Sequence, residues 1–335
     1  MKFRLVPSAL ALLMILLPSA PAADDLQVKP YRDWPGSIFL YSPENRVQAV
    51  IAPAVGGRLV RFSLGEDNIL LEHESAFGKT TANTTTNFTV GGYQCDLGPE
   101  IRGLPDHQNL WQGSYHSTVQ PNNLVRLSSE TNAATGIVLE KEILMAPDTG
   151  DLGLVQRMRN AGQDETHFCL WDRTLVQGGG FALVPLNPKS RFKARWSMRR
   201  KNGQQYSYDG DAPASTQVKI LGDVLIAQAV GDETKLGADS DAGWIAYARG
   251  RMLFVKYFPV TPKANYSDGG NTVELYFNPR FAELEPLSPE VNLKPGEKYE
   301  FPEKWILIPL EKEAFTFEAA RKLVKKIPPS PFRPR

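Results

Sequence analysis

Short runs in which apolar and polar residues alternate recur along the sequence, and they limit the possible folds more than any other feature. In the run LVRFSL, residues 59–64, the side chains of Val60, Phe62 and Leu64 occupy every second position. The run NTVELYFN, residues 271–278, alternates in the same way. Successive side chains of a β-strand point to opposite faces, so this period of two indicates strands with one face on a core.

Further runs of this kind cover much of the chain. They lie at residues 47–51, 136–144, 153–160, 166–171, 218–230, 244–258 and 304–310. Their lengths differ and no fixed repeat relates them, which argues against a propeller or a solenoid. Unequal strands joined by longer loops favour sandwiched antiparallel sheets, so the sequence predicts an all-β fold.

A helical period is clear only near the end of the sequence. In EAFTFEAARKLVKKI, residues 313–327, acidic residues come early and lysines late, as the helix dipole prefers. The apolar residues that share one helical face are Phe315, Ala319, Leu323 and Ile327. We expect a short helix packed on a sheet, although the lysines would also suit a membrane-surface helix. Two prolines follow it, and residues 328–335 are predicted to be a disordered tail.

The N-terminal sequence has the three parts of a secretory signal peptide. Lys2 and Arg4 precede an apolar run at residues 5–17, and the small-residue motif Ala20-Pro21-Ala22 follows. We therefore expect cleavage near Ala22 and a periplasmic or secreted protein that is not held in the membrane. Residues 23–327 are expected to form a single domain, because no linker or composition shift divides them.

The charge balance argues against a nucleic-acid partner. The formal net charge of +1 falls to −1 when Lys2 and Arg4 leave with the signal peptide. Basic and acidic residues are otherwise mixed, so no phosphate-binding surface is indicated. The basic stretch at residues 191–201 is the exception, and it is either a solvated strand or loop or a polyanion site.

Several common site types lack their sequence motifs. The chain has no GxGxxG or GxxxxGK[ST] phosphate loop, no GxSxG elbow and no HExxH zinc motif. Cys95 and Cys169 are the only cysteines, and both a disulfide and two buried free thiols are possible. We expect no metal or cofactor, and the sequence predicts no particular oligomeric state.

Two aromatic segments have the composition of a sugar site. His107 and His116 flank Trp111 in a polar segment that is expected to be a long loop. Trp171 lies beside Asp172 and Arg173 in an expected strand. A pyranose ring stacks on Trp or Tyr while polar groups bind its hydroxyls, but these aromatics could equally be core residues, and the histidines ordinary surface groups.

His167 belongs to the same expected strand as Trp171. It is either a hydrogen-bonded strand residue or an acid/base group that lines a cleft.

The segment from Glu283 to Glu297, ELEPLSPEVNLKPGE, carries a family resemblance. An acid, a Pro-containing bend, an Asn and then L-x-P-G-E resemble the C-terminal signature of galactose mutarotases. Residues 53–71 and 159–185 look like the N-terminal strand pair and the central strand segment of that family. On this signature Glu283 corresponds to the catalytic base of the family.

The sequence is most similar to an uncharacterised bacterial family of mutarotase-like proteins, a family of domains of unknown function. Its patterns are GGY…GPE, W-x-x-T…GG…P and E-x-E…P…L-x-PGE…W. They match Gly91–Glu100, Trp171–Pro185 and Glu283–Trp305 of this chain, and together they span nearly the whole chain after residue 22.

The resemblance implies a galactose mutarotase-like supersandwich of large antiparallel sheets that binds a monosaccharide or oligosaccharide in an open cleft. A mutarotase needs a base for the anomeric hydroxyl and an acid for the ring oxygen. Glu283 is the expected base and His167 the expected acid, although the usual Asn and Tyr neighbours of that His are missing here. The expected sugar-binding residues are Arg58, Glu100, His107, Trp111, His116, Trp171 and Glu285.

Two functions follow from these expectations. One is an exported carbohydrate-binding protein with aldose 1-epimerase-like activity, and the other is a non-catalytic binding module that kept the cleft without the acid. Glycoside hydrolysis or lyase chemistry by a carboxylate pair is a third interpretation. Glu283 and Glu285 would be near neighbours on one strand face rather than groups on either side of a glycosidic bond.

Overall fold

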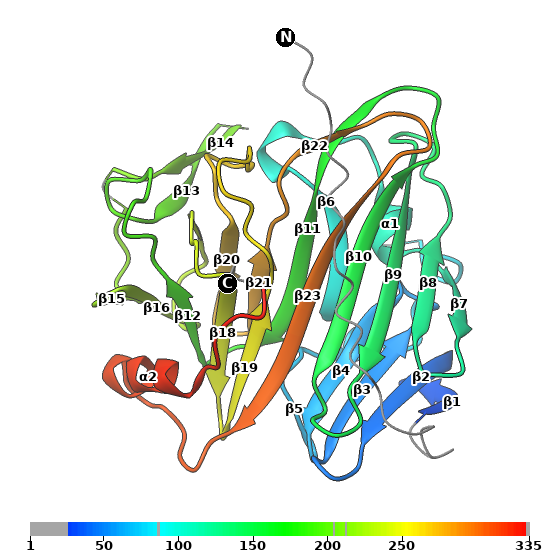
Figure 1. Cartoon of the computed structure of the whole chain (residues 1–335), viewed down its shortest axis with the longest axis horizontal. Coiled ribbons are helices and arrows are strands. Elements are labelled where there is room, and N and C mark those ends of the chain that lie inside the picture. The colour runs from blue at the N-terminus through cyan, green and yellow to red at the C-terminus, as the bar shows by residue number, and fades with distance from the viewer. Residues whose placement is uncertain (1–25, 86–87, 204, 212, 333–335) are drawn as a thin grey trace.

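The alternating runs form the strands of two large antiparallel sheets, shown as arrows in Figure 1. The structure is a computed structural model that describes residues 26–85, 88–203, 205–211 and 213–332. The predicted signal peptide at residues 1–22 lies outside these residues.

The first sheet contains 13 strands of the described chain. Its hydrogen-bonded order is β1-β2-β3-β4-β6-β11-β21-β20-β17-β13-β14, with β5 paired to β4 and β22 paired to β11. The strands are Leu26–Tyr31 (β1), Trp34–Ser42 (β2), Val47–Ala52 (β3), Arg58–Leu64 (β4), Asp67–Asn68 (β5), Gly92–Gly98 (β6), Thr166–Gln177 (β11), Ser197–Asn202 (β13), Gln205–Asp209 (β14), Thr234–Ala238 (β17), Val273–Phe277 (β20), Phe281–Pro286 (β21) and Val291–Leu293 (β22).

The second sheet contains 10 strands in the order β15-β16-β12-β18-β19-β23-β10-β9-β8-β7. The strands are Tyr115–Val119 (β7), Val125–Ser129 (β8), Ile137–Met145 (β9), Leu152–Asn160 (β10), Phe181–Pro185 (β12), Val218–Leu221 (β15), Val224–Gln228 (β16), Trp244–Arg249 (β18), Met252–Tyr257 (β19) and Lys298–Pro309 (β23). The helices are α1 (Gln108–Gln112) and α2 (Phe317–Leu323), with short 3-10 turns at Glu74–Ala76, Glu100–Arg102 and Val324–Lys326.

Each alternating run of the sequence forms strand, and two of the longer runs form hairpins. The run at 244–258 divides into β18 and β19, which pair around Gly250, a residue with a positive φ of 56°. The run at 218–230 divides into β15 and β16 in the same way. The prediction of an all-β fold with large antiparallel sheets and a short C-terminal helix is therefore confirmed.

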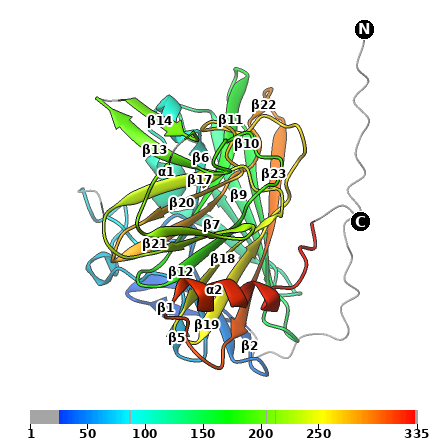
Figure 2. The ribbon, with the colours of Figure 1, turned by 90° about the vertical axis from the view of Figure 1, so that its left-hand side faces the viewer.

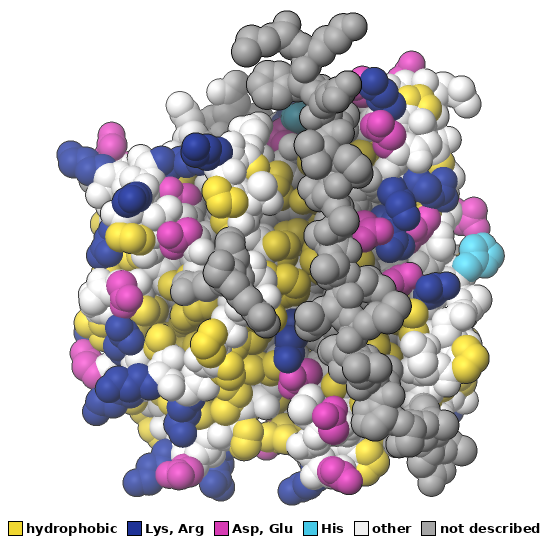
Figure 3. All heavy atoms as spheres, viewed as in Figure 1, with side chains coloured by type: hydrophobic (Ala, Val, Ile, Leu, Met, Phe, Trp, Pro, Cys, Tyr) yellow, Lys and Arg dark blue, Asp and Glu magenta, His cyan; other side chains and the backbone are white. Residues whose placement is uncertain are grey.

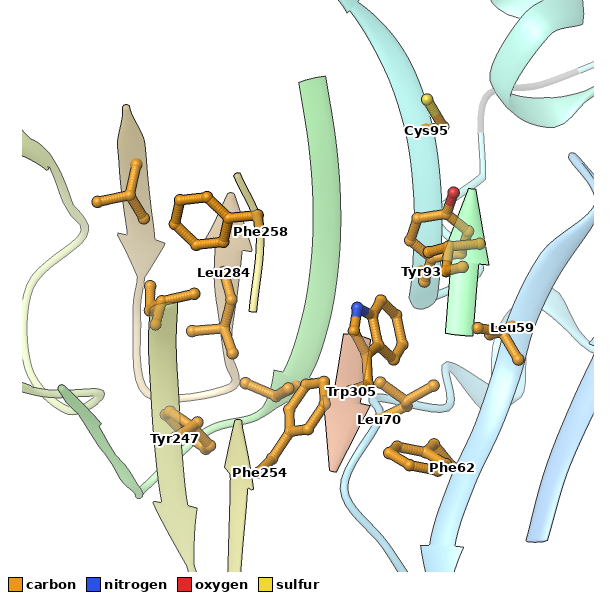
Figure 4. Close-up of a cluster of buried hydrophobic side chains, with 14 of the residues drawn as sticks. Leu59, Phe62, Leu70, Tyr93, Cys95, Tyr247, Phe254, Phe258, Leu284 and Trp305 are labelled. Atoms are coloured by element: carbon orange, nitrogen blue, oxygen red, sulfur yellow. The ribbon is translucent and has the colours of Figure 1, made fainter. Parts of the chain in front are cut away.

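The main core lies between the two sheets and is centred on Trp305 of β23 (Figure 4). The Trp305 ring is fully buried, and it packs edge-on against Phe254 of β19 at 5.3 Å and Tyr93 of β6 at 5.4 Å between ring centroids. Phe62 of β4 contacts the same ring from the first sheet at 6.1 Å. Burial of each such ring contributes about 1.5–3 kcal/mol, so this cluster holds the two sheets together.

Helix α2 covers the outer side of the second sheet, where it packs against β12, β15 and β16 (Figure 2). It begins after Thr316, whose Oγ1 accepts a hydrogen bond of 3.1 Å from the Ala319 amide, an N-cap that fixes the first helical residue. Ala320 and Leu323 are buried against the sheet. Phe315, which the sequence places on the apolar helix face, precedes this cap and is 76% exposed, so that part of the helix prediction is wrong.

The described part of the Pro-rich tail packs beside the second sheet. The Tyr257 hydroxyl donates a hydrogen bond of 2.9 Å to the Pro328 carbonyl, and Phe332 contacts the apolar cluster under α2. Ser330 is also buried. Residues 328–332, for which the sequence predicts disorder, thus have packing partners.

The face of the second sheet seen in Figure 3 has two parts of different character. Hydrophobic side chains gather over β18 and β19, beside α2. Basic and acidic side chains gather over β9 and β10, where Arg157 pairs with Glu140 at 3.2 Å and with Glu300 at 2.7 Å. Partly exposed pairs of this kind contribute little to the stability of the fold.

The two cysteines are free and buried. Cys95 of β6 lies opposite Asp172 of β11, whereas Cys169 lies opposite Gly98, so the thiols are three register positions apart. That offset corresponds to roughly 10 Å, beyond the reach of a disulfide. Burial raises the pKa of Cys169 to about 12. In the described part of the chain, no helix has the length and apolar character needed to cross a bilayer.

Candidate functional site

One face of the first sheet carries a set of polar side chains at alternate strand positions. On β21, Ala282 and Leu284 point into the core, so Glu283 and Glu285 point to the opposite face. The same alternation on β6 and β11 brings further polar groups to this face. We call the set the polar face, and its residues are Gln94, Asp96, Trp171, Arg173, Glu283 and Glu285.

A cavity of about 590 Å³ opens beside Glu283, and we call it the Glu283 cavity. Ligand pockets in proteins typically measure about 300–1,000 Å³, so a sugar would fit. The described residues that line it are Arg58, Phe88, Thr89, Val90, Gln94, Asp106, Gln108, Trp111, Arg173, Leu175, Phe281 and Glu283. The wall therefore contains both apolar side chains and hydrogen-bonding groups.

A tight Gly56-Gly57 turn brings β4 against helix α1 at one side of the cavity. Both glycines have positive φ, 74° and 52°. A Cβ atom at Gly56 would overlap the Trp111 carbonyl oxygen, so only glycine allows this approach. The buried Lys141 ammonium donates to the carbonyls of Gly56 at 2.7 Å and Gly57 at 3.2 Å, and fixes the turn.

Arg58 follows this turn and connects three segments of the cavity wall. Its Nη1 donates to the Gly91 carbonyl at 3.0 Å, and its Nη2 donates to the Trp111 carbonyl at 3.1 Å. Burial and the nearby charge of Arg173 lower the pKa of Arg58 to about 9. The guanidinium thus holds α1, and with it Trp111, at the cavity.

Arg173 lies at the centre of the polar face and binds two carboxylates. Its Nε and Nη2 donate to the two oxygens of Glu283 at 3.2 and 3.4 Å, and its Nη1 donates to Asp96 Oδ2 at 3.4 Å. The guanidinium also lies 4.7 Å from the ring centroid of Trp171. Burial opposes its charge, but Glu283 and Asp96 outweigh burial and raise the pKa of Arg173.

Glu283 is an ionised carboxylate in this arrangement. Burial acts to raise its pKa, but the positive charges of Arg173 and Lys235 have the larger combined effect, and the pKa of Glu283 is lowered. Its side chain is 9% exposed, and it forms part of the cavity wall. A fixed carboxylate at this place can accept a hydrogen bond or a proton from a ligand hydroxyl.

His107 anchors the loop that carries α1 to the polar face. Its Nε2 lies 2.7 Å from Asp96 Oδ1 and its Nδ1 lies 2.7 Å from the Pro105 carbonyl oxygen. A carbonyl and an ionised carboxylate only accept hydrogen bonds, so both ring nitrogens act as donors and the imidazole is protonated. Burial acts to lower its pKa, but the hydrogen bond and charge of Asp96 raise it.

Behind Glu283, a second group of charges surrounds Lys235 of β17. The ammonium contacts Glu100 at 2.7 Å, Glu285 at 2.9 Å and Glu274 at 3.2 Å. Trp171 Nε1 donates to Glu285 Oε2 at 2.7 Å, and Arg199 of the basic stretch pairs with Glu100 at 2.6 Å. Burial and the neighbouring carboxylates raise the pKa of Glu285 to about 8, although Lys235 opposes this.

The structure does not bring all the predicted site residues together. Three of them, Arg58, Trp111 and Glu283, line the cavity. His107 does not line the cavity, and it contacts Asp96, which in turn contacts Arg173 of the wall. Glu100, Trp171 and Glu285 belong to the Lys235 cluster, and the described cavity lining does not include them. The charged groups of Arg173 and Lys235 lie 4.7 and 4.5 Å from the centroid of the Trp171 ring, and Trp171 is 7% exposed, so it is not a free stacking platform.

His167 lies too far from Glu283 to act with it on one sugar ring. It precedes Arg173 by six positions on β11, which corresponds to about 20 Å along the strand. Its Nδ1 bonds Asn292 and its Nε2 bonds Glu290, each at 2.5 Å. His167 is therefore a hydrogen-bonded strand residue, which is one of the two interpretations that the sequence allows, and it is not placed to act as the acid beside Glu283.

His116 also lies outside the Glu283 cavity. It lines a separate pocket of about 350 Å³ with Thr81, Asn109 and Glu130. Its Nε2 lies 2.8 Å from Glu130, and both side chains are largely exposed. Helix α1 contributes Trp111 to one pocket and Asn109 to the other, so the expected loop does not bring His107 and His116 to the same site.

The most central residue of the site, Arg173, was not among the predicted site residues. Asp96, Gln94 and Lys235 were missed as well. The sequence signal that could have identified three of them is strand alternation. Gln94 and Asp96 are two positions apart on one strand, and Arg173 is two positions from Trp171 on the next. These residues therefore share the polar face. In the described residues, no three His, Cys, Asp or Glu side chains are placed to hold a metal ion.

Comparisons with known proteins agree with this architecture. A family described as "Domain of unknown function (DUF4380)" matches residues 104–308. No protein of curated function matches the sequence.

Solved structures of the galactose mutarotase type share the fold. A candidate aldose 1-epimerase from Escherichia coli K12 has a TM-score of 0.58 at 12% identity, over 79% of this chain and 97% of that chain. A galactose mutarotase-like protein from Lactobacillus casei ATCC 334 has a TM-score of 0.56 at 13% identity, over 82% and 100%. Another from Clostridium acetobutylicum has a TM-score of 0.51 at 10% identity, over 85% and 98%. The fold of this chain is therefore galactose mutarotase-like.

Proposed function

The chain belongs to the DUF4380 family and has a galactose mutarotase-like fold, and from this premise we propose that it binds a carbohydrate in the Glu283 cavity. The single observation that supports this most is the ionised Glu283 carboxylate, which Arg173 holds in the cavity wall. The names of the structural neighbours, an aldose 1-epimerase candidate and mutarotase-like proteins, agree with a sugar ligand.

The cavity has the mixed character that a pyranose needs. Trp111, Phe281 and Leu175 offer apolar surface for the C–H face of the ring, and Gln94 and Asp106 offer partners for hydroxyl groups. Glu283 accepts a hydrogen bond from one hydroxyl.

Binding can be tested with ligand-observed NMR on a panel of neutral mono- and oligosaccharides. A hydrogen bond to a charged group contributes about 1.5–3 kcal/mol, so Glu283→Gln should weaken binding by roughly 10- to 100-fold. Glu290→Gln is the matched control, because it also removes a carboxylate that contacts an Arg and a His, Arg102 and His167, but lies outside the cavity. Equal binding by wild type and Glu283→Gln would exclude this role of Glu283.

A second candidate function is interconversion of the anomers of a reducing sugar, with Glu283 as the base. The lowered pKa of Glu283 favours it, because the carboxylate is free to accept the anomeric proton at neutral pH. Saturation-transfer NMR of glucose and galactose measures the interconversion directly. If the anomers of every sugar that binds interconvert no faster than in buffer, the protein binds sugars without this activity.

We also propose that the protein works in the periplasm or outside the cell. The support is the signal-peptide pattern of residues 1–22. N-terminal sequencing of the protein from the periplasmic or secreted fraction should give Ala23 as the first residue. An intact Met1 on that material would count against cleavage.

A further inference from the structure

Strand β21 carries two carboxyl groups that project to the same face, and the proposed function uses only that of Glu283. We propose that Glu283 and Glu285 share a single proton, which Glu285 holds at rest and passes to Glu283 when a sugar ring opens. This proposal rests on the proposed binding of a reducing sugar at Glu283, and it assigns the proton donor that the cavity wall otherwise lacks.

The hydrogen bonds of Glu285 indicate which atom holds the proton. Its Oε2 accepts from Lys235 at 2.9 Å and from Trp171 Nε1 at 2.7 Å, so this oxygen is occupied by donors. Its Oε1 is buried and has no donor among the described residues. Two residues apart on one strand, Glu283 and Glu285 project to the same face. A proton on Oε1 gives this oxygen a partner, because it can then donate to the carboxylate of Glu283.

The charges around Lys235 favour one such proton. Ion pairs connect Asp96 to His107 and Arg173, and Arg173 to Glu283. Further ion pairs connect Lys235 to Glu100, Glu274 and Glu285, and Glu100 to Arg199. Around Lys235 this set has three carboxyl groups and two cations, Lys235 and Arg199, whereas the side with Asp96 and Glu283 also has the buried cation Arg58. Buried charges without counter-ions are expensive, so one carboxyl in the set is neutral.

Glu285 is the member best placed to be neutral. It is fully buried, and Glu274 and Glu283 face it from β20 and from its own strand. Tyr208 of β14 also approaches the group, and its pKa is raised by burial and by the charges of Glu274 and Glu285. Glu233 approaches Arg199 only from the exposed side, at 3.9 Å, where solvent screens it.

The resting pair would let Glu283 act as both acid and base. When Glu285 transfers its proton, Glu283 becomes a carboxylic acid, and Lys235 and Trp171 stabilise the new Glu285 carboxylate through Oε2. One oxygen of Glu283 then donates its proton to the ring oxygen of the sugar, as the bond between the ring oxygen and C1 breaks. Its other oxygen accepts the proton of the anomeric hydroxyl as the C1 carbonyl forms. The pair holds one proton before and after the step, so no other acid is needed.

Infrared spectroscopy in heavy water tests the shared proton without any sugar, because a neutral carboxyl has its own C=O stretching band. The full-length mature protein should show such a band at neutral pH, and Glu285→Gln should lose it. Glu283→Gln should keep a band but move its titration to lower pH, because removal of the neighbouring carboxylate favours ionisation of Glu285. A band that persists in Glu285→Gln and does not shift in Glu283→Gln would overturn the proposal.

Asp172 is the group that this measurement must separate from Glu285. Burial and Glu303 raise the pKa of Asp172 well above its usual value, against the effect of Lys256, so it can contribute a band of its own. It lies on the core face of β11, away from Glu283, and its band should therefore be the same in wild type, Glu283→Gln and Glu285→Gln. The difference spectra of the two variants isolate the pair.

A kinetic experiment separates this proposal from the proposed function. If the wild type interconverts a sugar, Glu285→Gln should bind that sugar within about threefold of wild type, since Glu285 does not line the described cavity. Its interconversion rate should fall by about 100-fold or more, and its pH profile should lose the limb near pH 8. A full rate in Glu285→Gln would overturn the relay. If the wild type binds no sugar, the proposed function fails, and the infrared result still decides the shared proton.

Discussion

Arg173 donates hydrogen bonds to both carboxylate oxygens of Glu283 and, through its third nitrogen, to Asp96. One guanidinium thereby fixes the carboxylate in the cavity and links it to the loop that His107 anchors. Arg173 and Glu283 are 110 positions apart in the sequence, and only the pairing of β11 with β21 brings them together.

Replacement of Arg173 should damage both stability and binding. Arg173→Met leaves Glu283 and Asp96 without their shared cation, which should cost about 3 kcal/mol of unfolding free energy and raise the pKa of Glu283. Arg173→Lys keeps the charge but loses the bidentate contact with Glu283. Compared with Arg173→Met, it should therefore recover part of the stability and less of the sugar affinity. Denaturant unfolding and sugar titration measure the two effects. Equal affinity in wild type and Arg173→Met would show that Arg173 does not position Glu283.

The His107–Asp96 pair should make stability depend on pH in one direction. The folded-state pKa of His107 is raised above its ordinary value of about 6.5, so its stabilisation is complete below pH 6.5 and is lost as the pH rises through the folded pKa. The difference in Tm between wild type and His107→Asn should therefore be largest near pH 5–6 and should shrink at higher pH. Calorimetry at a series of pH values measures it.

His116→Asn is the control for this series. Its partner Glu130 is 74% exposed, and exposed pairs contribute little, so the variant should differ from wild type by less than about 1 kcal/mol at every pH. A pH-independent difference for His107→Asn would contradict the assignment of His107 as the protonated partner of Asp96.

Gly56→Ala should disturb the cavity through helix α1. The residue has a positive φ, and the new methyl group would meet the Trp111 carbonyl oxygen. Gly250→Ala is the matched control, because Gly250 also has a positive φ but has no atom within 4 Å of the added Cβ. Both should lose about 1 kcal/mol from backbone strain, and Gly56→Ala should lose more and should also weaken sugar binding. Similar losses in the two variants, with normal binding, would contradict the role of this contact.

Neutral sugars should bind better than their acidic counterparts. The charged residues in the cavity lining are Arg58, Arg173, Asp106 and Glu283, and their charges cancel. The guanidinium groups are already held by carbonyls and carboxylates, so an added ligand carboxylate would lose water without gaining a free cation. Paired titrations of glucose with glucuronate and of galactose with galacturonate should favour the neutral member of each pair. Tighter binding of the acids would show that a guanidinium is available to the ligand.

Much of the fold could be predicted from local patterns, because strand alternation is a property of neighbouring residues. The runs at 47–51 and 244–258 form strands where the sequence predicts them, and the L-x-P-G-E signature identified the fold type. The helix start was misplaced because Phe315 fits the apolar period, whereas the Thr316 cap determines where the helix begins.

The candidate site was predictable only in part, since its geometry depends on strand order and register. Glu283 could be selected from its position in a family signature. The separation of His167 from Glu283 follows from the register of β11 against β21 and β22, which no local pattern contains. Arg173, the partner of Glu283, and Asp96, which Arg173 also binds, could not be identified for the same reason, although both lie near residues that the sequence did single out.

A crystal structure of the protein with its tightest-binding sugar tests the central claim most directly. The account predicts a sugar ring in the Glu283 cavity, with one hydroxyl within hydrogen-bond distance of the Glu283 carboxylate and the apolar ring face toward Trp111. A sugar bound in the pocket beside His116, or near His167 and Glu290, with the Glu283 cavity free of sugar, would contradict it.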